Sequence, residues 1–272
     1  MTRRIALITE YEGTAYAGSQ RQAGVPTVQA ALERALEALT GASCRVAAAG
    51  RTDAGAHAAG QVFAFDTGSD LPALRIRDGA NYHLPEDIAV VSAHEVEGGF
   101  DPRRHALARV YRYTFSERAV RSPLRRRFVH AVGRSLDVEA MSQALAYLEG
   151  TRDFAPFSGA LPLEKSTVRR MYRAEAWRDA GEVHLELEAN AFLPQQVRRT
   201  AAAVLRVGLG KLTLEGFEAL ADAAVRGAAE HVLPARGLCL QRVVYPDFPP
   251  ARAAQDAMAA QNEMAIGQHA DL

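Results

Sequence analysis

The sequence predicts an α+β fold built from two ferredoxin-like βαββαβ units, each with an antiparallel sheet and helices on one face, and a central cleft where we expect the active site. Short apolar segments typical of strands alternate with segments whose apolar residues have helical spacing. This alternation gives the order βαββαβ twice, on either side of a linker at residues 100–107. We therefore expect an N-terminal lobe, residues 1–104, a C-terminal lobe, residues 105–247, and a flexible tail, residues 248–272.

The first unit begins with a buried strand at residues 5–11. Thr27 can cap a helix whose apolar residues keep helical spacing until Gly41 ends it. Residues 44–48 and 61–65 are apolar and rich in strand formers, so they predict a pair of strands. A helix at about residues 71–82 and a strand at residues 88–96 complete the unit.

The second unit repeats this order more loosely. A strand is predicted at residues 110–115, and Asp137 can cap a helix that ends before Gly150. Residues 167–179 and 182–189 form a predicted hairpin around Asp179-Ala180-Gly181. Helices at about residues 195–207 and 214–225 precede a last strand at residues 238–244. Residues 249–272 are rich in Ala, Gln and Asp, which favours a mobile tail over a short helix at about residues 251–265.

The run from Gly50 to His57, GRTDAGAH, lies between the two central strands of the first unit. Asp-Ala-Gly is also ordinary turn chemistry, so a purely structural turn is the alternative to a functional loop. The loop at residues 50–60 is longer than the two to five residues that a hairpin needs, which indicates a further role. Asp53 is a candidate nucleophile, and Arg51 is the first candidate for keeping its carboxylate ionised.

Arginine dominates the basic residues, since 30 of the 32 are arginine and Lys165 and Lys211 are the two lysines. The formal net charge is zero, which argues against nonspecific polyanion binding. Three arginine clusters, at residues 103–112, 118–127 and 169–173, nevertheless suit phosphate recognition. Aromatic residues interleave with arginine at residues 109–113, where base stacking could join phosphate contacts. Base composition of the genome and solvated charged faces are the alternative explanations.

Several other classes are excluded by the sequence. No apolar run approaches the length of a membrane span, and the amino terminus lacks a secretory signal, so we expect a cytoplasmic protein without membrane contact. The glycine spacing at residues 13–19 resembles a phosphate loop, but Ser19 replaces the required lysine. The histidines and two cysteines lack metal-ligand spacing, so we expect no metal and no cofactor. Asp53 thus remains the best nucleophile candidate by elimination.

Seven ordered blocks over residues 4–247 closely resemble the TruA family of tRNA pseudouridine synthases. The blocks are Tyr11-Glu12-Gly13-Thr14 with Tyr16, Gly18, Gln20 and Gln22; residues 49–58 with Gly60-Gln61-Val62; Asn81 with Leu84-Pro85 and residues 87–90; residues 109–113; Asp153-Phe154 with Phe157; Asn190-Ala191-Phe192 with Val197-Arg198; and Gly237-Leu238 with Leu240, Val243, Tyr245 and Pro246. Glu12 and Ser19 depart from the aspartate and aromatic residue usual in the family, which bears on packing and RNA contact rather than on chemistry.

The resemblance implies a homodimeric, cofactor-free isomerase that converts uridine to pseudouridine in the anticodon stem-loop of tRNA, at positions 38, 39 and 40. Asp53 matches the catalytic aspartate, Tyr111 the tyrosine that stacks on the target base, and Arg198 the ion-pair partner of the aspartate. The resemblance thus gives the role of ion-pair partner to Arg198 instead of Arg51. It implies that Arg51 helps to move the target nucleotide out of the RNA stack. Further expected substrate contacts are Arg109, His57 and Asn190.

Two alternatives from other classes are kept. A noncatalytic tRNA-binding or RNA-folding module on the same scaffold would keep the arginine clusters and tolerate the loss of Asp53. A hydrolase with Asp53 as nucleophile is disfavoured, because no second carboxylate or metal constellation is evident for activating water.

Overall fold

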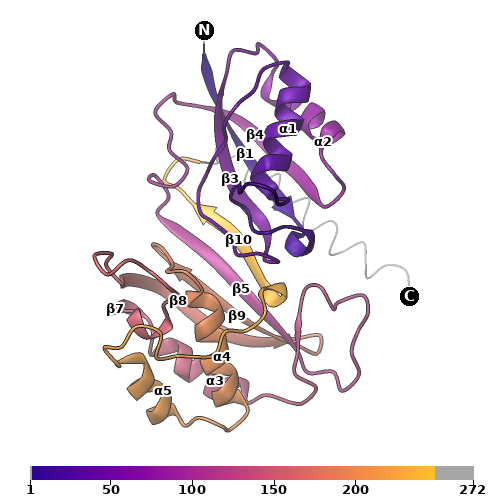
Figure 1. Cartoon of the computed structure of the whole chain (residues 1–272). Coiled ribbons are helices and arrows are strands. Elements are labelled where there is room, and N and C mark those ends of the chain that lie inside the picture. The colour runs from indigo at the N-terminus through magenta and orange to yellow at the C-terminus, as the bar shows by residue number, and fades with distance from the viewer. Residues whose placement is uncertain (1, 249–272) are drawn as a thin grey trace.

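One mixed β-sheet runs through residues 2–248, the part of the chain that this computed structural model describes (Figure 1). Its strands are β1 (Arg3–Tyr11), β2 (Ala47–Ala48), β3 (His57–Thr67), β4 (Ile88–Val96), β5 (Ala108–Ser116), β6 (His130–Ala131), β7 (Gly150–Asp153), β8 (Val168–Asp179), β9 (Glu182–Ala189) and β10 (Leu238–Val244). The helices are α1 (Val28–Thr40), α2 (Ala73–His83), α3 (Val138–Ala146), α4 (Gln196–Gly208) and α5 (Leu214–Ala221).

The strand order contains the ferredoxin-like arrangement twice. The full order is β4-β1-β3-β10-β5-β9-β8-β7, with β2 on β3 and β6 on β5. In the first unit β4-β1-β3-β2 gives the order 4-1-3-2 of a split βαβ fold, and in the second unit β10-β5-β9-β8 repeats it. The predicted α+β class of two such units is confirmed. The short polar strand β7, which apolar patterning did not predict, extends the far edge.

The two predicted sheets are joined into one, which the sequence did not indicate. β10 pairs in parallel with the start of β3, where Cys239 is opposite His57 and Leu240 is opposite Ala58. On its other side β10 runs antiparallel to β5, so that Leu240 is also opposite Tyr111. β2 occupies the remaining part of the same edge of β3. The division into separately folding lobes at residue 104 stays a prediction.

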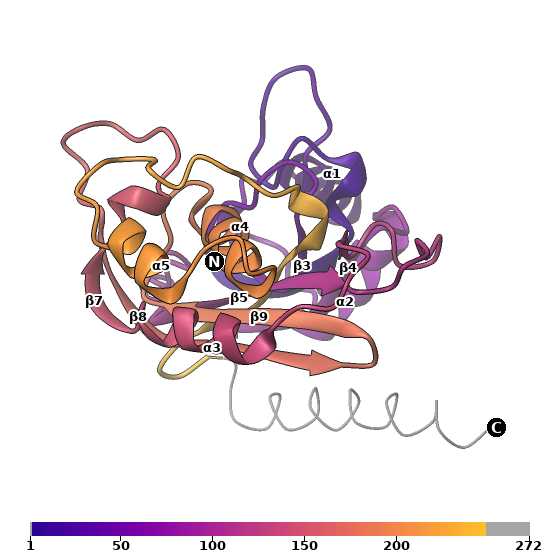
Figure 2. The same cartoon turned by 90° about the horizontal axis from the view of Figure 1, so that it is seen from below.

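The helices cover one face of this sheet. α1 and α2 pack together in the first unit, and α3 packs against β8, α4 and α5 in the second (Figure 2). Thr27 accepts a hydrogen bond from Ala30 N at 3.3 Å to cap α1, and Gly41 ends that helix with φ +70°. Asp137 caps α3 as predicted.

Large apolar side chains fill the space between the sheet and the helices. Leu7, Phe63 and Leu32 are fully buried in the first unit, as are Phe115 and Phe217 in the second. Across β5, odd-numbered residues from 111 to 115 share the face that the helices cover, whereas the even-numbered Arg112 lies on the opposite face, which is charged. This alternation aims the side chain at position 111 toward the helical layer.

The carboxy-terminal end of the described chain is packed. Phe248, which we included in the tail, is buried against Phe100, Tyr245 and His94, with ring centroids 5.4 to 5.5 Å from its own. The prediction of a tail that begins at residue 248 is therefore wrong for its first residue. The remainder of the predicted tail, residues 249–272, lies outside the described residues.

Candidate active site

The loop that carries Asp53 connects β2 to β3 and is held at both ends by its own hairpin. Ala49 N donates to Val62 O at 2.8 Å, and the side chain of Gln61 donates to Gly50 O at 3.0 Å. Ala56 N donates to Asp53 O at 3.1 Å, which closes a turn over Gly55 at φ +78°. The positive φ explains the glycine at that position.

A second segment, residues 11–19, packs against the same loop and forms hydrogen bonds with it. Thr52 N donates to Ser19 Oγ at 2.9 Å, and the hydroxyls of Tyr11 and Thr52 share a 2.8 Å hydrogen bond. A Cβ at Gly13 would lie 1.8 Å from Ala56 O, so only glycine allows the backbones to approach this closely. The glycine spacing at residues 13–19 thus serves close packing on the Asp53 loop.

Arg198 reaches Asp53 from the first turn of α4. Its Nη1 donates to Asp53 Oδ2 at 2.8 Å, and its Nε donates to Leu233 O at 2.7 Å. The side chain of Arg198 is 17% exposed and that of Asp53 is 37% exposed, so the pair is partly shielded from solvent. Within residues 2–248, Asp53 Oδ1 accepts no hydrogen bond. One carboxylate oxygen is therefore fixed and the other is available.

Tyr111 lies beside this pair on β5. Its side chain is buried, and its ring meets Phe192 edge to face, with centroids 5.1 Å apart and an interplanar angle of 81°. Burial raises the pKa of the Tyr111 phenol well above its usual value, and the negative charge of Asp53 adds to the shift. The phenol is therefore neutral at physiological pH.

These residues line one cleft with a cavity volume of about 860 Å³. The lining comes from the Asp53 loop, β5, residues 161–169 and the segment that leads into α4. It contains one carboxylate, that of Asp53, and six cationic side chains: Arg51, Arg103, Arg109, Lys165, Arg169 and Arg198. The formal net charge of the chain is zero, but the six cations and one carboxylate of this lining give the cleft a net formal charge of +5. Such a cleft attracts a polyanion and excludes a strongly cationic substrate.

No group of three His, Cys, Asp or Glu side chains in residues 2–248 is arranged to hold a metal ion. None of the helices in that range is both long and apolar enough to cross a membrane.

Comparison with known proteins identifies the family. The chain matches a family model described as tRNA pseudouridine synthase over residues 7–103 and 144–246. It is 44% identical over 250 residues to tRNA pseudouridine synthase A of Myxococcus xanthus, covering 92% of this chain and 94% of that protein. The chain belongs to the tRNA pseudouridine synthase family. A protein of the same name from Neisseria gonorrhoeae is 44% identical over 90% of this chain and 92% of its own, and one from a Geobacter species is 41% identical over 90% of this chain and its whole length.

Family membership makes the protein an isomerase of RNA modification and confirms the TruA resemblance. In this synthase the structure brings Asp53, Arg198 and Tyr111 together around one cleft. Arg51 lines the same cleft with an exposed side chain and forms no ion pair with Asp53. Our first interpretation, in which Arg51 neutralises Asp53, is wrong because Arg198 occupies that place.

Three further predicted contacts of the synthase make backbone interactions instead. Arg109 is buried and donates to four backbone carbonyl groups. His57 Nδ1 accepts from Gly13 N at 3.1 Å while Nε2 lies 2.7 Å from Arg127 O, so the ring joins the Asp53 loop to the segment before β6. Asn190 Oδ1 accepts from Arg170 N at 3.0 Å and Ala191 N at 2.9 Å. Their contact with substrate stays a prediction.

Ser19 and Phe192 contribute to the site without having been singled out as site residues. Ser19 stood out as a departure from the usual aromatic residue, and its hydroxyl accepts from the amide next to Asp53. Phe192 is part of a recognised block, and its contact with Tyr111 joins residues 81 positions apart. Proximity of this kind arises from strand pairing between β5 and β9, so local spacing carried no signal for it.

Two arginines of the cluster at residues 118–127 are paired with carboxylates of the protein itself. Arg125 makes two hydrogen bonds of 2.9 Å to the carboxylate of Glu182. Arg127 lies 3.2 Å from a carboxylate oxygen of Glu12, the residue that departs from the family aspartate. These pairs reduce the charge that the cluster offers to RNA.

Proposed function

We propose that this enzyme isomerises uridine to pseudouridine in the anticodon stem-loop of tRNA, at positions 38, 39 and 40, with Asp53 as the nucleophile. The observation that carries the proposal is the pairing of Asp53 with Arg198 inside a cleft whose other charged side chains are all cationic. The relatives in Myxococcus and Neisseria, which bear the name tRNA pseudouridine synthase A, support tRNA as the substrate.

The reaction breaks the bond between N1 and C1′ and forms a bond between C5 and C1′; C5 loses its proton and N1 takes up one, so that the product is an isomer of the substrate. A carboxylate can begin this exchange by attacking either the ribose C1′ or the uracil C6, and neither route needs a cofactor. Asp53 Oδ1 is the attacking atom in both cases, because Oδ2 is engaged by Arg198. Arg198 acts as an orienting group whose own position is fixed by Leu233 O.

Tyr111 provides the platform for the displaced base. Extrusion of a stacked nucleotide costs a few kcal/mol. Stacking on an aromatic ring returns about 1–3 kcal/mol. The contact with Phe192 holds the Tyr111 ring in one orientation, which reduces the entropy lost when the base arrives. Arg51, exposed on the rim of the cleft, is placed to contact the RNA strand from which the nucleotide leaves.

Our remaining proposals concern the support of the site and its assembly. Arg109, His57 and Asn190 favour substrate binding through the loops that they hold, since their polar atoms already bond to backbone groups. The predicted homodimer is tested by sedimentation of the full chain at micromolar concentration, where a monomer would contradict it. The predicted cytoplasmic location is tested by fractionation of cells that produce the protein.

The decisive experiment incubates the enzyme with unmodified tRNA transcripts, without added metal or nucleotide, and maps pseudouridine chemically. We expect product at positions 38, 39 or 40, and a rate at least about a thousandfold lower for Asp53→Asn. Asp78→Asn, which removes a carboxylate from an exposed ion pair with Arg77 on α2, is the matched control and keeps the wild-type rate. Wild-type activity in Asp53→Asn would refute the nucleophile. Product at other positions would refute the assigned site.

A binding measurement on the same variants separates the noncatalytic alternative. An enzyme that uses Asp53 chemically still binds tRNA when this residue is Asn, because the cationic lining of the cleft is unchanged. If the wild-type protein binds tRNA but forms no pseudouridine under any of these conditions, the RNA-binding module is the correct interpretation.

A further inference from the structure

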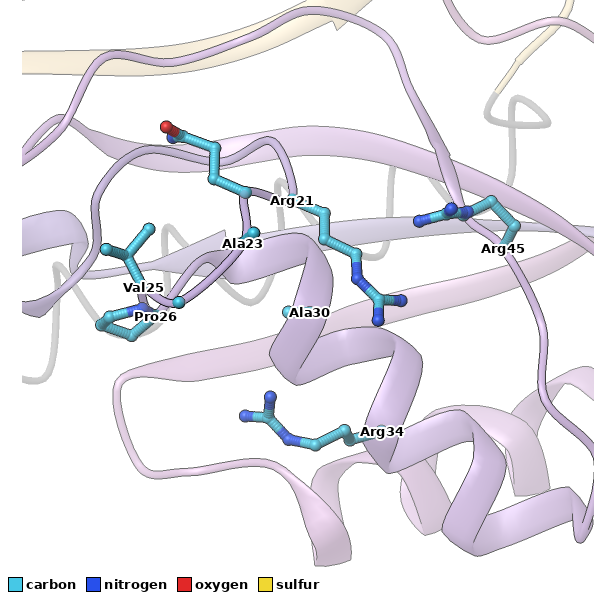
Figure 3. Close-up of a pocket in the computed structure, with 9 residues that line it drawn as sticks. Arg21, Ala23, Val25, Pro26, Ala30, Arg34 and Arg45 are labelled. Atoms are coloured by element: carbon cyan, nitrogen blue, oxygen red, sulfur yellow. The ribbon is translucent and has the colours of Figure 1, made fainter.

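A second cavity lies on the first unit and shares no lining residue with the Asp53 cleft. Its volume is about 680 Å³, and it is open to solvent and bordered by the loop at residues 21–26, by α1 and by Arg45 from the segment before β2 (Figure 3). The nine lining residues are Arg21, Gln22, Ala23, Gly24, Val25, Pro26, Ala30, Arg34 and Arg45. We call this cavity the arginine pocket.

Three arginines from three different elements line the arginine pocket, and among the described residues its lining contains no carboxylate. Beneath them lies Glu33, which is 5% exposed. Glu33 Oε2 pairs with Arg21 at 2.8 Å and lies 3.8 Å from Arg45. Arg34 forms no ion pair within residues 2–248. One buried carboxylate thus lies within ion-pair distance of two of the three guanidinium groups, and the three arginines leave a net positive charge at the cavity.

The pocket is preorganised by its own loop. Arg21 N donates to the side chain of Gln29 at 2.9 Å, and the side chain of Gln22 donates to Ala17 O at 2.7 Å. Ala17 N in turn donates to Pro26 O at 2.9 Å, which closes the base of the loop. Because Glu33 already orients the Arg21 guanidinium, an anion that binds here loses less free energy in ordering side chains.

The same loop is joined to the active site. Ser19, two residues before Arg21, exchanges hydrogen bonds with Thr52 in both directions, at 2.9 and 3.2 Å. Thr52 directly precedes Asp53. A polyanion with one group over Asp53 can therefore extend onto the element that forms the arginine pocket, where phosphates that do not flank the target nucleotide meet guanidinium groups.

The chemistry of the lining distinguishes phosphate from base recognition. Within the described part of the chain, the lining has no aromatic side chain on which a base could stack. Its donors are guanidinium forks, which match phosphate oxygens in geometry and carry no information on base sequence. Given the proposed function, on which this inference rests, we propose that the arginine pocket binds backbone phosphates of the same tRNA, away from the nucleotide that is modified.

The test compares two double variants of equal charge in tRNA binding. Arg34→Gln/Arg45→Gln removes two exposed arginines from the pocket and leaves the Arg21–Glu33 pair intact. Arg75→Gln/Arg77→Gln removes two arginines from α2 in the same unit and is the matched control. Dissociation constants are measured with unmodified tRNA from 50 to 300 mM KCl by fluorescence anisotropy, and folding is checked by circular dichroism.

We expect the pocket variant to bind about tenfold more weakly near 100 mM salt, and the slope of log Kd against log salt to fall by about 2, since each lost phosphate contact removes close to one unit. The control should change both quantities by less than half as much. Equal effects in the two variants would overturn the proposal.

Ethylation interference on tRNA phosphates locates the contact independently of affinity. Wild-type protein should be sensitive to ethylation at phosphates that do not flank the target uridine, and the pocket variant should lose that sensitivity. Sensitivity confined to the phosphates around the target would overturn the proposal. Pseudouridine mapping is a separate readout, so failure of the arginine pocket leaves the assignment of Asp53 standing, and failure of catalysis is recognised by the absence of product from the wild type.

Discussion

Arg109 is expected to stabilise the junction of three chain segments, the linker before β5, the start of the Asp53 loop and the end of β9, and its replacement by Met tests this. Its Nη1 donates to Ala106 O at 3.3 Å and Asn190 O at 2.8 Å, while Nη2 donates to Ala49 O at 2.9 Å and Arg103 O at 2.6 Å. The guanidinium is buried and has no carboxylate partner among residues 2–248, and burial lowers its pKa. Methionine keeps the apolar stem and removes all of these donors.

The cost follows from the three shorter bonds, each of 2.9 Å or less. Hydrogen bonds to a charged group contribute about 1.5 kcal/mol each or more, which gives roughly 4–5 kcal/mol for three. Methionine also removes the desolvation cost of the buried cation, which offsets about 2 kcal/mol of that loss. We therefore expect Arg109→Met to lower the free energy of unfolding by about 2–3 kcal/mol, a large part of the 5–15 kcal/mol that is usual for a folded domain. Arg109→Lys should lose about half as much, because an ammonium group has fewer donors in a more compact arrangement.

Urea unfolding, followed by circular dichroism, measures these losses. Arg77→Met is the control, since Arg77 belongs to an exposed ion pair, and it should change stability by less than about 1 kcal/mol. A loss in Arg109→Met no greater than in this control would refute the reasoning. Wild-type stability of Arg109→Lys together with weakened tRNA binding would instead support Arg109 as a direct substrate contact.

Three shorter predictions follow from the same contacts. Ser19→Ala should lower stability by about 1 kcal/mol and slow pseudouridine formation, because the amide beside Asp53 loses its acceptor; unchanged urea unfolding would contradict this. Phe192→Ala should slow turnover about two- to tenfold through loss of the edge-to-face contact worth about 0.5–1.5 kcal/mol, and an unchanged rate on saturating tRNA would count against it. Burial lowers the pKa of His57, so below about pH 6.5 the unfolded chain takes up a proton that the folded chain does not, and the free energy of unfolding decreases as the pH is lowered. His57→Gln should make this decrease smaller in urea titrations between about pH 7.5 and 5. The same pH dependence in the variant and the wild type would refute the prediction.

Regular elements were predictable wherever the pattern of apolar residues was strong. The bounds of β4 (Ile88–Val96) and β10 (Leu238–Val244) agree with the prediction at both ends, and the caps at Thr27 and Asp137 were found from residue type alone. The joining of the two sheets was not predictable, since it depends on two residue pairs between β10 and β3 that lie far apart in the chain.

The site was predictable in part. Asp53 stood out from its loop, whereas its pairing with Arg198 across 145 residues came from family resemblance and from no local pattern. Arg109 shows why charge in a sequence is ambiguous, because a guanidinium beside aromatic residues satisfies carbonyl oxygens as readily as phosphate oxygens. Burial, which decides between the two, is a property of the folded chain.

The place of β10 between β3 and β5 has a consequence for synthesis on the ribosome. Strands β1 to β4 leave the ribosome first and can pair among themselves, but the edge of β3 beside His57 stays open until residues 238–244 have been made. The two halves of the cleft therefore come into register late in translation. Until β10 is in place, the exposed edge of β3 is the part of the nascent chain that most needs protection from aggregation.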